Sequence, residues 1–304
     1  MSKEAGTILD DQEVAFFRDN GYLRIPGFLA TDELKRLQAD AATVIEYALG
    51  EGRNERGVYY APSVGDGEAV LSRIEFMTHH SEACRWLMGN PDLLRLVERI
   101  SGRDFLSIGE SMVLKMPGEG AQVAWHRDHG SHWSGPPQNY NVDFYLDDAT
   151  LETCLWAIPG SNLWPDEKAG PLQRRDCVPS GIEDAVPLVM NAGDVLLHDA
   201  RLVHGSPTTH ADSVRRTLYY WFYSLAALEP YAGSSNYQAN RWRYLHQCIE
   251  ARRQSSYPGR EVAYEYGAEV DGASLEGEGV SNIYSDHGYW DPDRALPGSG
   301  EKRA

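Results

Sequence analysis

The sequence lacks long apolar segments. Nowhere in its 304 residues do 18 apolar residues follow one another, so no transmembrane helix is predicted. The opening stretch, MSKEAGTILDDQEVAFF, contains no apolar run long enough for a signal peptide. We therefore expect a soluble, cytoplasmic protein.

Cysteine is scarce as well. The chain has four cysteines, Cys84, Cys154, Cys177 and Cys248, which lie far apart and form no CxxC pair. This spacing indicates neither a zinc knuckle nor a disulfide framework. We expect all four to be buried thiols, because free cysteine is among the most buried residue types.

Basic residues are outnumbered. Lys and Arg total 28 while Asp and Glu total 45, which gives a formal net charge of -17. A field of this sign repels polyanions, so we expect neither nucleic acid nor an anionic membrane as a partner. The same repulsion favours a neutral or cationic small molecule as substrate, although one basic cleft could overrule it. Nothing in the sequence indicates an oligomeric state.

The composition is typical of a globular protein, with 42% hydrophobic and 24% charged residues. The length allows one large or two ordinary domains, and we expect a single domain in three parts. Residues 1–106 are predicted to be mainly helical and residues 107–225 to form the core. Residues 226–304 are predicted to form a helix, which either folds over the mouth of the core or packs on the sheet, and a tail that is a lid, an interface arm or loosely ordered.

Helix signals dominate the N-terminal part. Asp10 and Glu13 resemble a capping box that opens a helix, and Gly21 is well placed to end it. A short strand follows in YLRIPGFL, and Thr31 is expected to cap the next helix. A further helical segment is predicted over residues 82–100.

From residue 107 the pattern changes to short β-prone runs, among them SMVLKM, NVDFYLDD and RRTLYYWFYSL, which Gly and Pro interrupt. About eight such strands without alternating helices favour an antiparallel double-sheet architecture over βαβ units. The predicted fold class is mainly β with flanking helices, built on a double-stranded β-helix of the jelly-roll or cupin-like type.

The segment VAWHRD contains the first two candidate metal ligands. In a strand His126 and Asp128 point to the same face, because side chains alternate. A third ligand must then come from a remote segment, where His198, His204 and His210 are the candidates. Two histidines and one carboxylate leave three coordination positions open, which suits non-haem Fe(II) oxygenases, whereas structural zinc prefers four closed ligands.

His204 fits best among the three. Gly205-Ser206 follows it directly, and Arg215 comes eleven residues later at the start of a strong strand. A planar guanidinium matches a dicarboxylate cosubstrate whose other end chelates the iron. His198 lies inside the run LLHD and is interpreted as a packed strand histidine.

Other histidines have plainer interpretations. His129 and His132 could form an HxxH zinc pair, but Gly130 disfavours a helix there and no third ligand is evident. His246 lies on a predicted helix and is interpreted as an ordinary helix histidine. Arg127 points away from Asp128, and we expect it to form a salt bridge.

Three motifs resemble the phytanoyl-CoA dioxygenase family of Fe(II)- and 2-oxoglutarate-dependent oxygenases. The block from Gln122 to Asp128 is similar to its Q-x-x-W-H-x-D strand, FYLDDATLETCLWAIPGS to its central strand and turn, and GDVLLHDARLVHGS to its distal half. Two positions depart from the family pattern: E-N-G-C-L reads LETCL at residues 151–155, and Asn162 replaces a frequent histidine. Both departures concern the substrate side of the pocket and leave the implied metal ligands unchanged.

The resemblance implies the cofactors Fe(II) and 2-oxoglutarate, with O2 as a second cosubstrate. It implies three iron ligands, which are His126, Asp128 and His204. It also implies a group of cosubstrate residues, in which Arg215 and Ser206 hold the far carboxylate while Gln122 and Lys115 contact cosubstrate or substrate. Because Asp128 is present, chloride has no vacant position, which disfavours halogenation.

The implied activity is hydroxylation of an aliphatic C–H bond in a small molecule, such as a natural-product intermediate or an amino-acid derivative, with release of succinate and CO2. Alternatives within the class are desaturation, cyclisation and epimerisation. Alternatives outside it are a cupin-like metal enzyme that does not use 2-oxoglutarate and a non-catalytic binding protein. The predicted substrate-binding residues are Trp133, Met112, Tyr219 and Trp221, for which core packing is the alternative.

Overall fold

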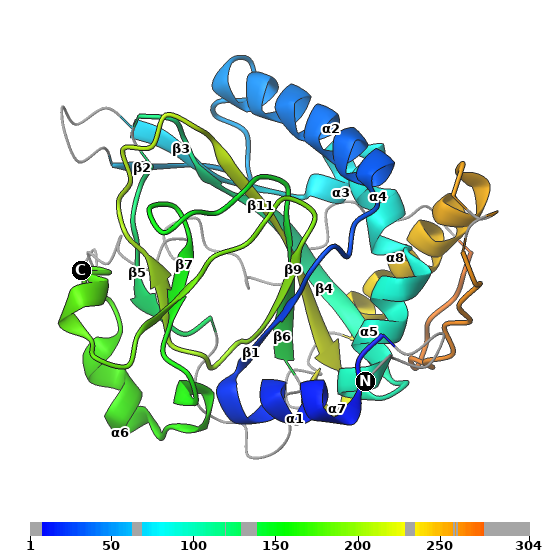
Figure 1. The fold of residues 1–304 in the computed structure, drawn as a ribbon. Coiled ribbons are helices and arrows are strands. Elements are labelled where there is room, and N and C mark those ends of the chain that lie inside the picture. The colour runs from blue at the N-terminus through cyan, green and yellow to red at the C-terminus, as the bar shows by residue number, and fades with distance from the viewer. Residues whose placement is uncertain are drawn as a thin grey trace, which may run out of the picture.

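Two antiparallel β-sheets face each other in the centre of the molecule (Figure 1). The computed structural model describes residues 8–62, 69–118, 120–128, 139–228, 235–257, 259 and 261–276. A seven-stranded sheet, here called the major sheet, has the order β1-β9-β6-β11-β4-β3-β2, and a four-stranded minor sheet has the order β5-β10-β7-β8. This arrangement confirms the predicted double-stranded β-helix.

The strands of the major sheet are β1 (Tyr22–Ile25), β2 (Val58–Pro62), β3 (Ala69–Glu75), β4 (Phe105–Lys115), β6 (Asn139–Tyr145), β9 (Val195–Asp199) and β11 (Arg215–Ser224). Those of the minor sheet are β5 (Val123–His126), β7 (Leu155–Ala157), β8 (Val186–Leu188) and β10 (His204–Ser206). The helices are α1 (Asp11–Asn20), α2 (Thr31–Leu49), α3 (Met77–His80), α4 (Glu82–Met88), α5 (Pro91–Ser101), α6 (Asp166–Ala169), α7 (Leu225–Leu228) and α8 (Ser235–Gln254).

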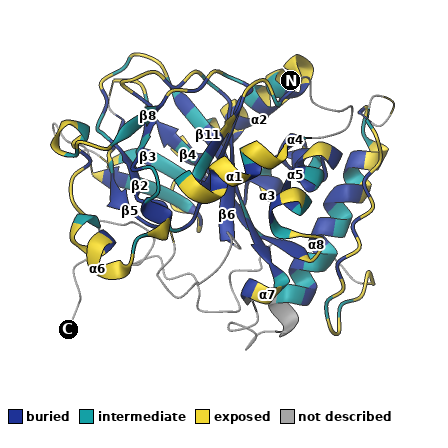
Figure 2. Ribbon diagram, turned by 60° about the horizontal axis from the view of Figure 1, so that its bottom comes forward, coloured by how far each residue is buried: buried dark blue, intermediate teal, exposed yellow. Residues whose placement is uncertain are grey.

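Helices cover one face of the major sheet and the minor sheet covers the other (Figure 1). Along β4 and β11, Met112, Leu218 and Tyr220 point toward the helices and join the main hydrophobic core. Each such fully buried apolar side chain contributes about 1.5–3 kcal/mol. Figure 2 shows these strands largely buried, while α1 and α6 expose much of their surface. Because the helix-facing side supplies the core, the inner side of the sheet can carry polar groups.

The N-terminal helix begins as expected. The backbone N–H of Asp10 donates to Glu13 Oε2 at 2.9 Å, and that of Glu13 donates to Asp10 Oδ1 at 2.8 Å. Gly21 ends α1 in the left-handed conformation, with φ of 78°. The expectation for Thr31 is wrong: Ala30 is the extended residue before α2, and Thr31 is its first helical residue, without a side-chain capping bond.

The hairpin β2–β3 was not anticipated. It lies in the part of the chain predicted to be mainly helical, and β3 pairs with β4 to extend the major sheet. The predicted helical segment over residues 82–100 forms as α4 and α5, which start at Glu82 and Pro91. The major sheet therefore has more strands than the core predicted from residue 107 onward.

The C-terminal helix packs on the outer face, away from the minor sheet (Figure 1). Arg241 of α8 donates to the Ser107 carbonyl at 2.7 Å and pairs with buried Glu110 at 3.2 Å. A Cβ added to Gly89, which follows α4, would lie 2.2 Å from the Cys248 carbonyl oxygen of α8, so the two helices meet at a glycine. Helix α8 thus covers the outer face of the major sheet; residues 277–304 lie outside the described part.

None of the helices in the described part of the chain combines the length and the apolar character that crossing a membrane requires. All four cysteines are buried and unpaired, as predicted.

Candidate active site

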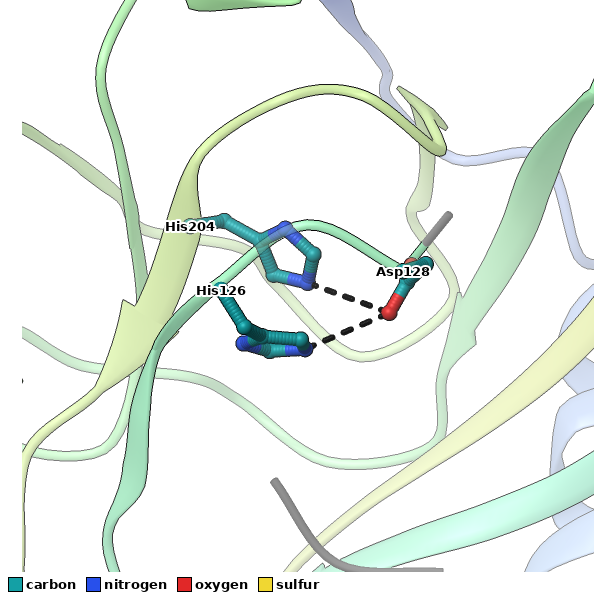
Figure 3. A group of neighbouring side chains, drawn as sticks. All are labelled: His126, Asp128 and His204. Atoms are coloured by element: carbon teal, nitrogen blue, oxygen red, sulfur yellow. Dashed lines mark ion pairs between the residues drawn. The ribbon is translucent and has the colours of Figure 1, made fainter. Parts of the chain in front are cut away.

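The three predicted metal ligands meet between the two sheets. Strands β5 and β10 are antiparallel neighbours, and His204 is the register partner of His126. Asp128 follows β5 directly and turns back toward both rings (Figure 3). One ligand atom from each of the three residues lies within 4.8 Å of the other two. Residues 78 positions apart in the chain are therefore brought to one point by a single strand pair.

Close contact between these strands depends on Gly205. A Cβ at this position would lie 2.9 Å from the Val123 carbonyl oxygen and 3.1 Å from the Cys177 Sγ. The β5–β10 pairing also shifts register between His204 and Ser206. A side chain at residue 205 would push β10 away from β5 and separate the two histidines.

Both histidine rings are oriented by the backbone. The Nδ1 of His126 lies 2.8 Å from the Ala124 carbonyl oxygen, and the Nδ1 of His204 lies 2.9 Å from the Leu202 carbonyl oxygen. A carbonyl oxygen only accepts, so each Nδ1 carries the hydrogen. In a neutral ring the remaining nitrogen, Nε2, then presents a lone pair, which is the usual arrangement of a metal-binding histidine.

The lone pairs converge on one carboxylate oxygen. Asp128 Oδ1 lies 3.2 Å from Nε2 of His126 and 3.8 Å from Nε2 of His204. Burial and the neighbouring His126 lower the pKa of His204 to about 3, so its ring is neutral. A bare nitrogen lone pair facing a carboxylate oxygen is stabilised by a cation between them. Two imidazole nitrogens and one carboxylate form the donor set preferred by non-haem Fe(II), so the residues fit this metal.

The other oxygen of Asp128 is held by the major sheet. Asp128 Oδ2 lies 2.7 Å from Asn141 Nδ2 and 2.8 Å from His198 Nε2. The opposite nitrogen of His198, Nδ1, lies 2.6 Å from Asp143 Oδ2, and both His198 and Asp143 are fully buried. Asp128 is thus bonded from one side while its Oδ1 faces the histidines.

The charges of this cluster are coupled. Burial alone would lower the pKa of His198, but Asp143 and Asp128 raise it to about 10. Burial alone would raise the pKa of Asp128, but the three surrounding histidines hold it well below its usual range. Asp128 therefore remains ionised, and His198 donates from both ring nitrogens. His198 is packed in β9 as predicted, but its contact with Asp128 was missed.

A cavity of about 130 Å³ extends from the cluster of His126, Asp128 and His204 along the inner face of the major sheet. Among the predicted site residues, its lining includes His126, Asp128, His204, Ser206, Arg215, Gln122, Tyr219 and Trp221. Arg215, Tyr219 and Trp221 all line the cavity because side chains alternate along β11, so residues 215, 219 and 221 share its inner face.

Arg215 is a buried cation without a carboxylate partner in the described part of the chain. Its side chain is 2% exposed, and its Nη1 donates to Thr217 Oγ1 at 2.8 Å while its Nε donates to the Thr153 carbonyl at 3.3 Å. Among the described residues no carboxylate lies within 4.0 Å of this guanidinium. A buried charge is stable only when paired, so a ligand anion in the cavity is expected to pair with Arg215.

Two further cosubstrate predictions have different surroundings. Lys115 is the register partner of Arg215, but its Nζ donates to the carbonyls of Ala121 and Pro207, and Lys115 does not line the cavity. Gln122 reaches the cavity wall, although its amide nitrogen donates to Asp176 at the surface, at 2.7 Å. Lys115 therefore braces the segments beside the cavity.

The prediction for Met112 does not fit the structure. Met112 is fully buried among the helix-facing residues, whereas its neighbours Ser111 and Val113 line the cavity. Trp133 and the alternative zinc pair His129 and His132 lie outside the described residues.

Two residues outside the ligand set have local structural roles. Asn162 is buried beside Gly21 and donates to the Arg18 carbonyl at 3.1 Å, away from the cavity. Arg127 pairs with Asp166 at 3.2 Å, as expected for a salt bridge.

Comparison with known proteins gives one family. The family model described as phytanoyl-CoA dioxygenase (PhyH) matches residues 17–217. Among curated proteins, the dioxygenase lolE1 of Epichloe uncinata is 25% identical over 214 residues, covering 68% of this chain and 80% of the relative. A probable alpha-ketoglutarate-dependent hypophosphite dioxygenase of Stutzerimonas stutzeri is 24% identical over 242 residues, covering 73% and 80%.

Among solved structures, AviO1 from Streptomyces viridochromogenes Tue57 is 30% identical, with a TM-score of 0.59 over 73% of this chain and 98% of AviO1. The match therefore spans nearly all of AviO1.

Proposed function

This chain belongs to the phytanoyl-CoA dioxygenase family and is a non-haem Fe(II)- and 2-oxoglutarate-dependent dioxygenase; we propose that it hydroxylates an aliphatic C–H bond of a small molecule. The resemblance predicted from the motifs is confirmed by the family match. The observation that carries the proposal is one cavity lined by both the convergent His126, Asp128 and His204 and the unpaired Arg215.

His126, Asp128 and His204 would hold Fe(II), since both Nε2 atoms and Oδ1 of Asp128 face one another. The two backbone carbonyls that accept from Nδ1 fix the ring orientation before metal arrives. The hydrogen bonds to Asp128 Oδ2 favour coordination through Oδ1 alone. A set of two histidines and one carboxylate would leave coordination positions of the metal open for the cosubstrates.

Arg215 binds the far carboxylate of 2-oxoglutarate, and Ser206, which is buried on β10 of the minor sheet and lines the same cavity, adds a hydroxyl donor. A guanidinium offers two parallel N–H groups to a carboxylate, which fixes both position and orientation. A metal enzyme that does not use 2-oxoglutarate would leave this buried cation without a partner, which disfavours that alternative.

When bound, Fe(II) with 2-oxoglutarate and O2 supplies the oxidising chemistry that converts a C–H bond into an alcohol, with succinate and CO2 as coproducts. The chain supplies the open ligand set, the orientation of the cosubstrate and a buried cavity that limits water. Tyr219 and Trp221 line the substrate side of this cavity.

The test is an anaerobic titration with Fe(II) and 2-oxoglutarate, followed by the visible charge-transfer absorption of the chelate. Wild type is expected to develop the band. Arg215→Gln is expected to need at least about 30-fold more 2-oxoglutarate, since loss of one partner of a buried charge pair costs about 2–5 kcal/mol.

Arg216→Gln is the matched control, because Arg216 is the next residue but pairs with Asp147 at 2.7 Å. The absence of a band in wild type, or unchanged affinity in Arg215→Gln, contradicts the proposal. Product mass then separates the reactions: hydroxylation adds one oxygen, desaturation and cyclisation remove two hydrogens, and epimerisation leaves the mass unchanged.

A further inference from the structure

One part of the cavity wall lies at the edge of the major sheet, where the hairpin β2–β3 adjoins β4 and the inner face carries Trp221 of β11. Arg73 of β3 is the register partner of Val113 in β4, and Glu75 is the partner of Ser111. Both Ser111 and Val113 line the cavity, so Arg73 and Glu75 lie on the same inner face. Arg73 itself lines the cavity, together with Trp221. This wall is separate from Arg215 at the other end of β11.

The guanidinium of Arg73 contacts Glu75 with its Nε edge and the ring of Trp221 with one flat face. Its Nε forms an ion pair with Glu75 Oε1 at 2.6 Å, and its Cζ lies 5.1 Å from the centre of the Trp221 ring. The terminal nitrogens Nη1 and Nη2 make no hydrogen bond with any described residue. The side chain is 22% exposed, so a ligand can reach it. Arg73 is thus an oriented guanidinium whose outer edge has no partner within the described part of the chain.

Glu75 only partly offsets this charge. Burial raises the pKa of Glu75 to about 7, although Arg73 acts in the opposite direction. Glu75 therefore gives up its proton less readily than an exposed glutamate does. The outer edge of the Arg73 guanidinium offers a positive group to the cavity even though the chain as a whole is acidic.

A second polar group on this wall lacks a partner. The Oγ of Ser111 belongs to a residue that is 1% exposed, and it makes no hydrogen bond within the described structure. A buried polar atom without a partner costs about 1–3 kcal/mol, so such atoms are normally satisfied by protein, water or ligand. The hydroxyl of Ser111 and the outer edge of Arg73 both offer hydrogen-bond donors to the cavity.

We propose that the substrate carries an anionic oxygen group, a carboxylate or a phosphate, which binds the Nη1/Nη2 edge of Arg73 with the Ser111 hydroxyl as an additional donor. A planar guanidinium edge matches two oxygens of such a group, and the aromatic face of Trp221 keeps the plane in position. The local cleft thereby overrules the neutral or cationic substrate expected from the net charge. The inference rests on the proposed function, because it assigns a substrate to the same cavity.

The experiment uses the anaerobic enzyme loaded with Fe(II) and 2-oxoglutarate, with the charge-transfer band as reporter. The probes are compounds that share one carbon skeleton and end in a carboxylate, a phosphate or a primary amide. The anionic members are expected to perturb the band of wild type at about 10-fold lower concentration than the amides, since a charged partner adds about 1.4 kcal/mol or more. The stronger of the two anions identifies the natural group.

Arg73→Gln is expected to abolish the preference for the anion, and Arg73→Lys to keep part of it, while 2-oxoglutarate affinity stays unchanged in both. Arg95→Gln is the matched control, because Arg95 is 23% exposed and lies on α5, outside the cavity. Circular dichroism confirms that each variant is folded.

Amides that bind as well as the anions overturn the inference, as does a preference that survives in Arg73→Gln. Wild type that forms the 2-oxoglutarate chelate but binds no anionic probe overturns it as well. Failure of the proposed function is distinct, because then the chelate band itself does not form.

Discussion

Removal of His198 tests how the major sheet supports the metal-binding residues. His198 donates to Asp128 Oδ2 at 2.8 Å, and after its loss Asn141, at 2.7 Å, is the remaining described residue that holds that oxygen. A hydrogen bond to a charged group contributes about 1.5–3 kcal/mol, and loss of a residue that orients a metal ligand typically weakens metal affinity about 10–100-fold. We therefore expect the dissociation constant for Co(II), used as a stable substitute for Fe(II), to rise by 10–100-fold, which is roughly 1.4–2.7 kcal/mol.

His198→Gln alone would leave Asp143 buried without its partner, which costs about 3–5 kcal/mol of stability. The double variant His198→Gln/Asp143→Asn avoids this, because both groups become neutral and keep hydrogen-bonding amides. The assay is anaerobic titration of the metal-free enzyme with Co(II), in which the visible spectrum reports affinity and coordination. A looser Asp128 is expected to change the spectrum as well as the affinity.

His246→Gln serves as control, since His246 lies on α8, far from the cavity lining. Co(II) affinity and spectrum identical to wild type in the double variant, with an unchanged melting temperature, would refute the role of His198 as a positioning residue.

Three further outcomes concern stability. Burial raises the pKa of Glu75 from 4.5 to about 7, so the folded state binds the proton more tightly, and stability falls as pH rises through this window. Glu75→Gln should remove up to ~3 kcal/mol of this pH dependence, measured by denaturant titrations at pH 4.5 and 7.5. A dependence of stability on pH that is the same as in wild type contradicts the assignment. Gly89→Ala should lower the free energy of unfolding by about 1–3 kcal/mol, because the added Cβ would collide with α8. Gly170→Ala, which has open space around it, is the control and should leave stability unchanged in thermal unfolding. Asp10→Ala should cost about 0.5–2 kcal/mol through loss of the α1 cap, and an unchanged unfolding free energy would argue against it.

The convergence of His126, Asp128 and His204 could be predicted from the sequence because it depends on local rules. Strand alternation placed His126 and Asp128 on one face, and the segment HGS followed by Arg215 singled out His204. The role of His198 could not be predicted, because it depends on the register that pairs β9 with β6 and brings Asp143 beside it. No sequence spacing reports that register.

The prediction for Met112 could have been avoided from the sequence alone. Met112 has the opposite parity to Lys115, so both could not face one cavity on the same strand. The hairpin β2–β3 was harder to find, because VYYAP is short and ends in proline, and its β character is stabilised by pairing with β4. Arg73 was overlooked for the same reason, since a residue assigned to a helical region has no expected face in a sheet.

The position of the hairpin β2–β3 also bears on how new members of such a lineage arise. It forms one edge of the major sheet, whereas His126 and His204 lie on the minor sheet. Substitutions in the hairpin after gene duplication can therefore alter which molecule is recognised and leave the iron chemistry intact. Divergence of specificity is then expected to accumulate first along this edge.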